Sequence, residues 1–163
     1  MKTAASFVIP LWVSLTSLPY FAIAGEALLA RDEMSSRFGI LKVLDDQDEK
    51  RLYIGKKPLP ISDHLVRIEQ KWQMGAKDVF FVFMDSGANG CPVTYAFVSV
   101  ESKVVSLSDA FGNCTDSPNV ERLGVHIIVS FGRLSRDRPA LLLEFDDGAV
   151  FEGRKKLKVT SVA

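Results

Sequence analysis

A fully apolar run covers Val79 to Met84, between the polar stretches 75–78 and 85–87. A short continuous run of this kind predicts a strand that is covered on both faces, because a half-buried strand alternates with polar residues. Leu141 to Phe145 is similar, with Glu144 as its only charge. Two such strands predict two packed layers, either sheet against sheet or sheet against helix.

Alternating apolar positions predict further strands on either side. Residues 38–54 are typical of a hairpin whose long, solvated turn is the acidic run 45–50. Residues 56–60 contain two prolines, which indicates a connector or a sheet edge. Residues 140–151 predict a hairpin that turns at Asp147-Gly148. The basic and apolar alternation of residues 154–159 is typical of an exposed edge strand.

Two segments are harder to assign. In residues 62–73, alternation groups Val66, Ile68 and Trp72, whereas helical spacing groups Leu65, Ile68 and Trp72. We prefer the strand that alternation indicates, and a helix remains the alternative. Residues 116–124 predict a single helical turn, because serine and proline stand at its start and glycine at its end. Residues 125–131 then return to a strand.

The two cysteines, Cys91 and Cys114, enclose two strand-like runs. If the two runs form a hairpin whose centre lies midway between the cysteines, the numbers of opposed residues add up to 205, which is also the sum of 91 and 114. Val98 then faces Leu107, and Thr94 faces Phe111. This register predicts one apolar face and one mixed face, as in a half-buried antiparallel pair.

The same register places the cysteines opposite each other. Opposed strand residues have Cα atoms about 4.5–5.5 Å apart, within the range of roughly 4.4–6.8 Å that disulfides span. We therefore predict a disulfide between Cys91 and Cys114 that stabilises the fold. Together, these patterns predict a mainly β protein: an antiparallel sandwich or partly open barrel of about 8–10 strands, with one or two short helical turns.

The first 24 residues predict a secretory signal peptide. Lys2 precedes an apolar run, and Ala22-Ile23-Ala24 provides a small-x-small cleavage site. A membrane anchor is the alternative, but prolines and hydroxyl side chains interrupt the apolar stretch. Cleavage leaves residues 25–163 as one β-rich domain without stable membrane insertion, and residues 25–37 form a loosely ordered arm.

The charge balance and the cysteine pair limit the compartments and the classes of partner that we expect. Twenty basic residues balance twenty acidic residues, so no overall field attracts nucleic acid. A disulfide in an exported chain requires an oxidising compartment. We therefore expect a periplasmic or secreted protein that does not bind nucleic acid.

Motifs for catalysis and for metal binding do not appear. The chain has no nucleophile elbow, phosphate-binding loop or zinc-protease helix motif. The stretch 85–90 resembles the start of a calcium loop but has Gly87 and Ala96 where ligands are needed. His126 is expected to be structural and His64 exposed. We predict no catalytic residue, no bound metal and no cofactor.

The function that these observations favour is a non-enzymatic, exported module that binds another protein of the cell envelope. Many inhibitors, immunity proteins against secreted toxins and envelope adaptors are exported chains of this size without catalytic motifs. The loops beside the disulfide are the predicted contact surface. Its candidate residues are Asp85, Ser86, Asn89, Asp109, Asn113 and Asp116.

Two other functions remain as alternatives. Fully apolar strands could line a cavity for an apolar ligand inside a small barrel or sandwich. A hydrolase of unrecognised type could use carboxylates of Asp85, Asp109 and Asp116 if these converge at the open end of the cysteine hairpin.

Overall fold

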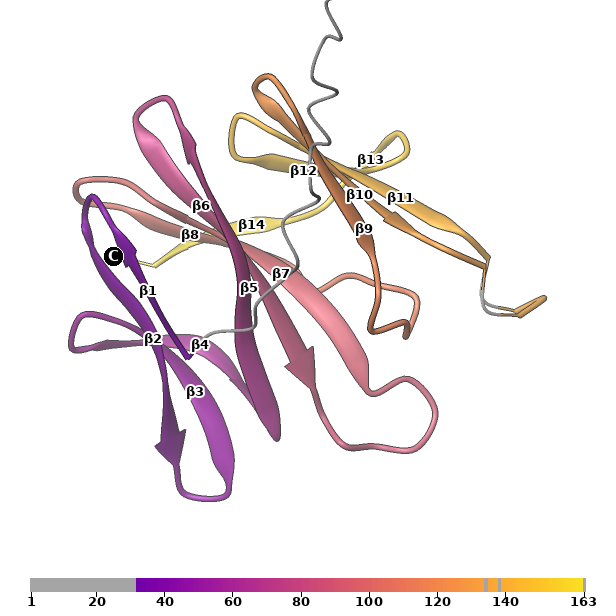
Figure 1. Cartoon of the computed structure of the whole chain (residues 1–163), viewed down its shortest axis with the longest axis horizontal. Helices are drawn as coiled ribbons and strands as arrows, with labels where there is room; N and C mark the ends of the chain where they lie inside the picture. The colour runs from indigo at the N-terminus through magenta and orange to yellow at the C-terminus, as the bar shows by residue number, and fades with distance from the viewer. Residues whose placement is uncertain (1–31, 134, 138, 163) are drawn as a thin grey trace, which may run out of the picture.

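The computed structural model describes residues 32–133, 135–137 and 139–162. Within these ranges the chain forms fourteen strands and no helix. The strands make three antiparallel sheets (Figure 1), so the predicted β-sandwich is confirmed, in a form with three layers. The strands exceed the predicted number mainly because the structure adds short strands at sheet edges.

The first sheet has the strand order β1-β2-β3-β4, and each strand pairs with the next one along the chain. Its strands are β1 (Glu33–Ser36), β2 (Gly39–Asp46), β3 (Glu49–Ile54) and β4 (Lys57–Asp63). The proline-containing segment 56–60 thus enters an edge strand, where a missing N–H costs least. The hairpin at 38–54 is confirmed, but its turn is short, since Asp46 pairs with Glu49.

The central sheet has the order β14-β8-β7-β6-β5, and the third sheet has the order β13-β12-β11-β10-β9. The strands of the central sheet are β5 (Leu65–Met74), β6 (Lys77–Asp85), β7 (Val93–Val100), β8 (Val105–Ser108) and β14 (Val159–Val162). The strands of the third sheet are β9 (Asn119–Leu123), β10 (His126–Phe131), β11 (Leu141–Asp146), β12 (Ala149–Glu152) and β13 (Lys155–Lys156).

Strand β6 lies in the middle layer with both faces covered, as its apolar run predicts. Phe80 and Val82 face the first sheet, whereas Phe81 and Phe83 face the third sheet. We call the two clusters the first core and the second core. The first core contains Leu41, Val43, Leu52, Leu59, Ile61, Val66, Ile68, Phe80, Val82, Met84, Ala96, Val98, Val100 and Leu107. The second core contains Trp72, Met74, Val79, Phe81, Phe83, Val93, Tyr95, Phe97, Phe111, Ile127, Val129, Phe131, Leu143, Phe145, Val150 and Leu157.

Residues 62–63 end β4 and residues 65–73 belong to β5, which confirms the preferred interpretation but changes which side chains share a face. The pairing of β5 with β6 shifts register between Ile68 and Gln70. A β-bulge of this kind adds one residue and reverses the faces of the residues that follow. Val66 and Ile68 therefore pack in the first core, whereas Trp72 packs in the second.

The register of the cysteine hairpin is confirmed for its inner half. Val98 pairs with Leu107 and Ser99 pairs with Ser106, both adding up to 205. The predicted Thr94–Phe111 pair is wrong, because Phe111 pairs with Tyr95 instead. One extra residue between Ser108 and Phe111 causes this shift.

The shift places the Phe111 ring in the second core, where its centroid lies 5.4 Å from that of Phe97 and 6.2 Å from that of Phe81. At the shift, the Phe97 N–H donates a hydrogen bond to the Ser108 hydroxyl. Phe97 is buried rather than on a mixed face, so β7 is covered on both sides.

The helical turn predicted for residues 116–124 is wrong. Asn119 to Leu123 forms β9 and pairs with β10, and Val120 packs against the second core. The Ser117 hydroxyl donates to the Asp116 carboxylate instead of accepting a backbone N–H as a helix cap does. Pairing along five residues of β10 satisfies more backbone groups than one isolated turn would.

At the N-terminal end, the predicted loose arm includes residues that are ordered. β1 pairs with β2, and Arg37 forms hydrogen bonds with the central sheet. Residues 25–31 and the predicted signal peptide lie outside the described residues. At the other end, the basic segment after β12 supplies the short edge strand β13, as predicted, before β14 joins the central sheet.

Candidate functional site

The disulfide between Cys91 and Cys114 joins two surface segments at one end of the central sheet. Their Cα atoms are 4.8 Å apart, within the spacing expected for opposed residues. One segment, 86–92, connects β6 to β7, and the other, 112–117, leads from Phe111 to β9. We call these two segments the disulfide loops.

The first disulfide loop is exposed and held by its own short hydrogen bonds. The Asp85 carboxylate accepts the Gly87 N–H at 2.8 Å, and the Ser86 hydroxyl accepts the Ala88 N–H at 3.3 Å. The Ser86 N–H donates to the Pro92 carbonyl, which closes the loop at its base. Ser86 and Asn89 are both exposed at the surface.

The second disulfide loop is fastened to the second core. Gly112 adopts a φ of 140°, and a side chain there would meet the Tyr95 ring at 3.5 Å. The Tyr95 hydroxyl donates to the Thr115 carbonyl at 3.2 Å. Burial raises the pKa of Tyr95, with smaller contributions from Glu69 and Asp116, so this hydroxyl stays protonated and remains a donor.

Two of the six candidate residues do not belong to this surface. Asn113 is buried, and its Nδ2 donates to the carbonyls of Gly132 at 2.7 Å and Pro139 at 3.1 Å. It therefore ties the disulfide loop to both ends of the segment between β10 and β11. Asp109 follows β8, and its N–H donates to the Lys158 carbonyl just before β14.

The remaining four candidates lie on or next to the two segments that the disulfide joins. Asp85 ends β6, Ser86 and Asn89 lie on the first loop, and Asp116 lies exposed on the second. Asp109 lies apart from them, at the base of the neighbouring strand. In the ranges that the structure describes, no group of three or more His, Cys, Asp or Glu side chains is placed to hold a metal ion.

Neither histidine is part of the disulfide loops, although the His64 ring lies beside Gly87 of the first loop. His126 lies on β10, with Nδ1 at 2.9 Å from the Glu144 carboxylate and 3.6 Å from that of Asp146. His64 is exposed between β4 and β5. The exposure of His64 is as expected.

The sequence does not predict a charged pair on β5. The Arg67 Nε lies 3.3 Å from the Glu69 carboxylate, and its guanidinium stacks on the Phe83 ring at 4.0 Å. The side chain of Glu69 is only 10% exposed. Alternation predicts that a carboxylate within a strand faces solvent. The bulge in β5 at Glu69 breaks this alternation, so the burial of Glu69 does not follow from the sequence pattern. The sequence feature that indicates this pair is the presence of opposite charges two positions apart, Arg67 and Glu69, within an otherwise largely apolar segment.

Glu69 makes a pH-dependent contribution to stability. Burial raises its pKa above the ordinary value of 4.5, and Arg67 opposes the rise. The folded state therefore binds this proton more tightly than the unfolded state, so the contribution falls as pH rises from about 4.5 through the folded pKa. We expect Glu69→Gln to raise the free energy of unfolding at neutral pH relative to acidic pH, by on the order of 1 kcal/mol or less.

Urea denaturation of both proteins across this pH range measures the difference. Glu152→Gln, which alters an exposed glutamate on β12, is the matched control and should show no such trend. A stability difference between Glu69→Gln and the native protein that does not change with pH would contradict the assignment.

No protein-family model, curated protein or solved structure matches the chain. The part of the chain described by the structure contains no helix long and apolar enough to cross a membrane. The disulfide fits an oxidising compartment such as the periplasm or the extracellular space.

Proposed function

We propose that the protein is an exported, non-enzymatic module that binds another protein through its disulfide loops. The observation that supports the proposal is one covalent bond, on a three-layer scaffold, that joins the exposed segment 86–92 to a second segment whose exposed residues are Asp116 and Ser117. Binding surfaces are commonly loops held by a rigid framework, because little conformational entropy is then lost on association.

The scaffold supports this role through its packing. The apolar side chains of β6 are divided between two filled cores, with Phe80, Phe81 and Val82 fully buried. The first disulfide loop connects β6 to β7, and both cores together fix the positions of these two strands. Tyr95 extends this support to the second loop through its bond to Thr115.

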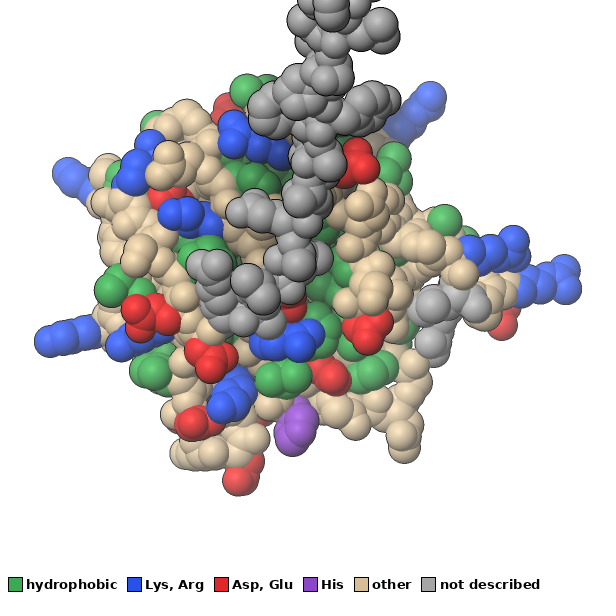
Figure 2. Space-filling model, in the orientation of Figure 1, with side chains coloured by type: hydrophobic (Ala, Val, Ile, Leu, Met, Phe, Trp, Pro, Cys, Tyr) green, Lys and Arg blue, Asp and Glu red, His purple; other side chains and the backbone are tan. Residues whose placement is uncertain are grey.

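The chemistry of the surface indicates the kind of partner. Ser86 and Asn89 offer neutral donors and acceptors, and Asp116 offers a carboxylate. Figure 2 shows basic and acidic side chains interspersed on the face that it displays, and the whole chain carries no net charge. We therefore propose recognition by local polar contacts rather than by a long-range field, with a periplasmic or secreted partner of the inhibitor, immunity or adaptor type.

Capture of the partner on the purified, disulfide-bonded protein tests the proposal. We expect one stoichiometric partner from an envelope or culture-fluid extract, and at least about tenfold weaker binding by the variant Asn89→Arg, since one buried misplaced charge costs this much or more. Isothermal titration with the isolated partner measures the change.

Gln73→Arg is the matched control, because it also replaces an exposed neutral amide by arginine, near the end of β5 that lies away from the disulfide loops. It should bind like the native protein. The proposal fails if no stoichiometric partner is captured, or if Asn89→Arg and Gln73→Arg bind that partner equally well.

A further inference from the structure

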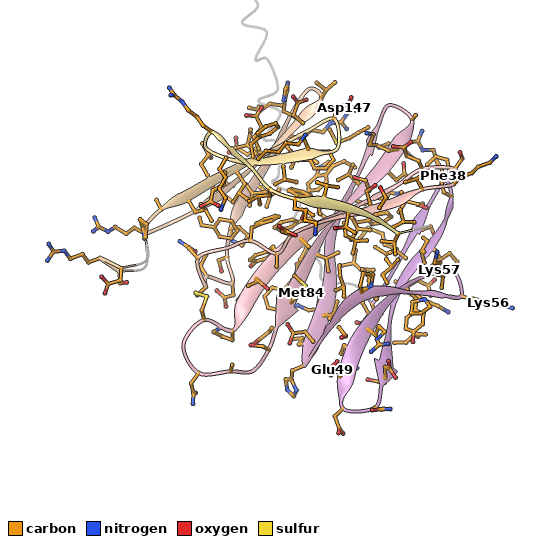
Figure 3. The ribbon with its side chains drawn as sticks, turned by 180° about the vertical axis from the view of Figure 1, so that it is seen from behind. Phe38, Glu49, Lys56, Lys57, Met84 and Asp147 are labelled. Carbon is orange, nitrogen blue, oxygen red and sulfur yellow. A yellow bond between two sulfur atoms is a disulfide. The ribbon has the colours of Figure 1, made fainter. Side chains whose placement is uncertain are left out.

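A recess with a volume of about 510 Å³ lies between the central sheet and the third sheet, at the end opposite the disulfide loops. The turn between β5 and β6 forms one wall, and the turns after β9 and β11 form the other. Sites for small molecules have volumes of about 300–1,000 Å³, so the recess is large enough for one. Figure 3 shows Asp147, which lines it, well separated from the disulfide.

The floor of the recess is apolar. Met74 and Phe145 line it and belong to the second core, so the recess continues that core outward. Val125 lines it as well and is 66% exposed, and the neighbouring Leu123 is 59% exposed. An apolar group placed here would cover surface that the fold itself leaves in contact with water.

The rim of the recess carries more negative than positive charge. The Lys77 Nζ lies 3.0 Å from the Asp147 carboxylate and 3.6 Å from that of Glu101, and it donates to the Asp147 carbonyl at 3.2 Å. The donors of this ammonium are therefore directed at groups of the protein. Two carboxylates facing one ammonium leave one negative charge, and the Asp147 side chain is 91% exposed. Both carboxylates keep lone pairs for a second cation.

The wall that carries Lys77 is fixed in place. Arg37 donates from its guanidinium to the Gly75 carbonyl at 3.0 Å and to the Lys77 carbonyl at 2.7 Å. The same guanidinium pairs with the buried Asp78 carboxylate. Because the first sheet holds this turn, the recess is formed before any ligand arrives, and little ordering is needed on binding.

We propose that this recess binds a small organic cation with an apolar body. The apolar body lies on Met74, Val125 and Phe145, and the cationic group is held by Glu101 and Asp147. The inference is independent of the function proposed for the disulfide loops. On the other side of the β11–β12 turn, a second recess of about 560 Å³ shares Asp147 with the first but is otherwise lined by residues 148–149 and 156–159, which include Lys156 and Lys158.

Amide chemical shifts of the ¹⁵N-labelled protein test the proposal, with 2-phenylethylammonium as the probe. We expect saturable shifts at Met74 to Lys77, at Val125 and at Asp147, with a millimolar dissociation constant, as suits so small a ligand. The anion 3-phenylpropanoate, of nearly the same shape, should bind these residues at least about fivefold more weakly, because the charged contacts become repulsive.

Variants then separate the two halves of the site. Ala76→Trp fills the recess from its wall and should abolish the shifts. The double variant Glu101→Gln/Asp147→Asn should bind the cation about fivefold more weakly and leave binding of the uncharged 2-phenylethanol unchanged. Asparagine tolerates the positive φ of 43° at position 147, so the turn is kept.

Leu142→Gln, a change to an exposed apolar residue on β11 that does not line the recess, is the matched control and should bind like the native protein. The proposal is overturned if the cation gives no saturable shifts, if the anion binds these residues as tightly as the cation, or if the shifts map to the second, basic recess.

Discussion

Replacing Arg37 by alanine is expected to lower the free energy of unfolding by about 3–5 kcal/mol, because it leaves a buried charge without its partner. The Asp78 side chain is fully buried, and Arg37 approaches it with Nε at 2.8 Å, with a terminal nitrogen at 2.7 Å and with its own backbone N–H at 2.8 Å. The pair also connects the first sheet to the central sheet. Chemical denaturation monitored by tryptophan fluorescence measures the loss.

Arg51→Ala is the matched control. Arg51 is as exposed as Arg37, at 37% against 38%, but its partner Asp46 is 30% exposed. A partly exposed pair is worth about 0–1 kcal/mol, so this variant should remain close to the native protein. Adding Asp78→Asn to Arg37→Ala removes the isolated charge and should restore part of the stability. Equal losses for Arg37→Ala and Arg51→Ala would show that the buried carboxylate is not the cause.

Loss of the disulfide is the second large effect expected. The bond closes a loop between residues separated by 23 positions, which corresponds to about 3.5 kcal/mol in the chain-entropy model. The double variant Cys91→Ser/Cys114→Ser should therefore unfold at a clearly lower urea concentration. We expect the sheets to persist, since β6 and β7 remain paired along eight positions.

The loss of order should be confined to the disulfide loops. Hydrogen exchange should accelerate most at residues 86–92 and 112–117, and in β6 and β7 by no more than the loss of global stability requires. Reducing the native protein should reproduce the effect, whereas the same reductant should leave the double-serine variant unchanged. Identical unfolding midpoints for the oxidised and reduced native protein would exclude a stabilising role.

The sequence predicts the central strands better than the β-bulges at which the register shifts. The apolar run of β6 identifies a strand covered on both sides, because no half-buried strand lacks polar residues. The sum of 205 gives the correct pairing of Val98 with Leu107 because alternation ties register to burial. The bulges at Glu69 and before Phe111 cannot be read from alternation, since each changes the face without changing the composition.

The sequence predicts the part of the candidate site that local pairing determines and not the part that the packing of the layers determines. Cys91 and Cys114 locate the loops, because covalent geometry demands their proximity. Asn113 stands beside a cysteine but is buried, where it hydrogen-bonds to two backbone carbonyls of the segment between β10 and β11. Contacts of this kind depend on how layers stack. The recess near Lys77 is likewise formed by three turns that are remote in sequence.

The division of β6 between two cores limits where the chain can change in length. From Val79 to Met84, successive residues of this strand belong to alternate cores. One inserted residue would therefore turn Phe81 and Phe83 toward the first core and bring side chains of the first core into the second. Both cores would then be mismatched at once. Insertions and deletions in related chains should therefore concentrate in turns such as Gln47-Asp48 and in the disulfide loops, and should be excluded from β6 and β7.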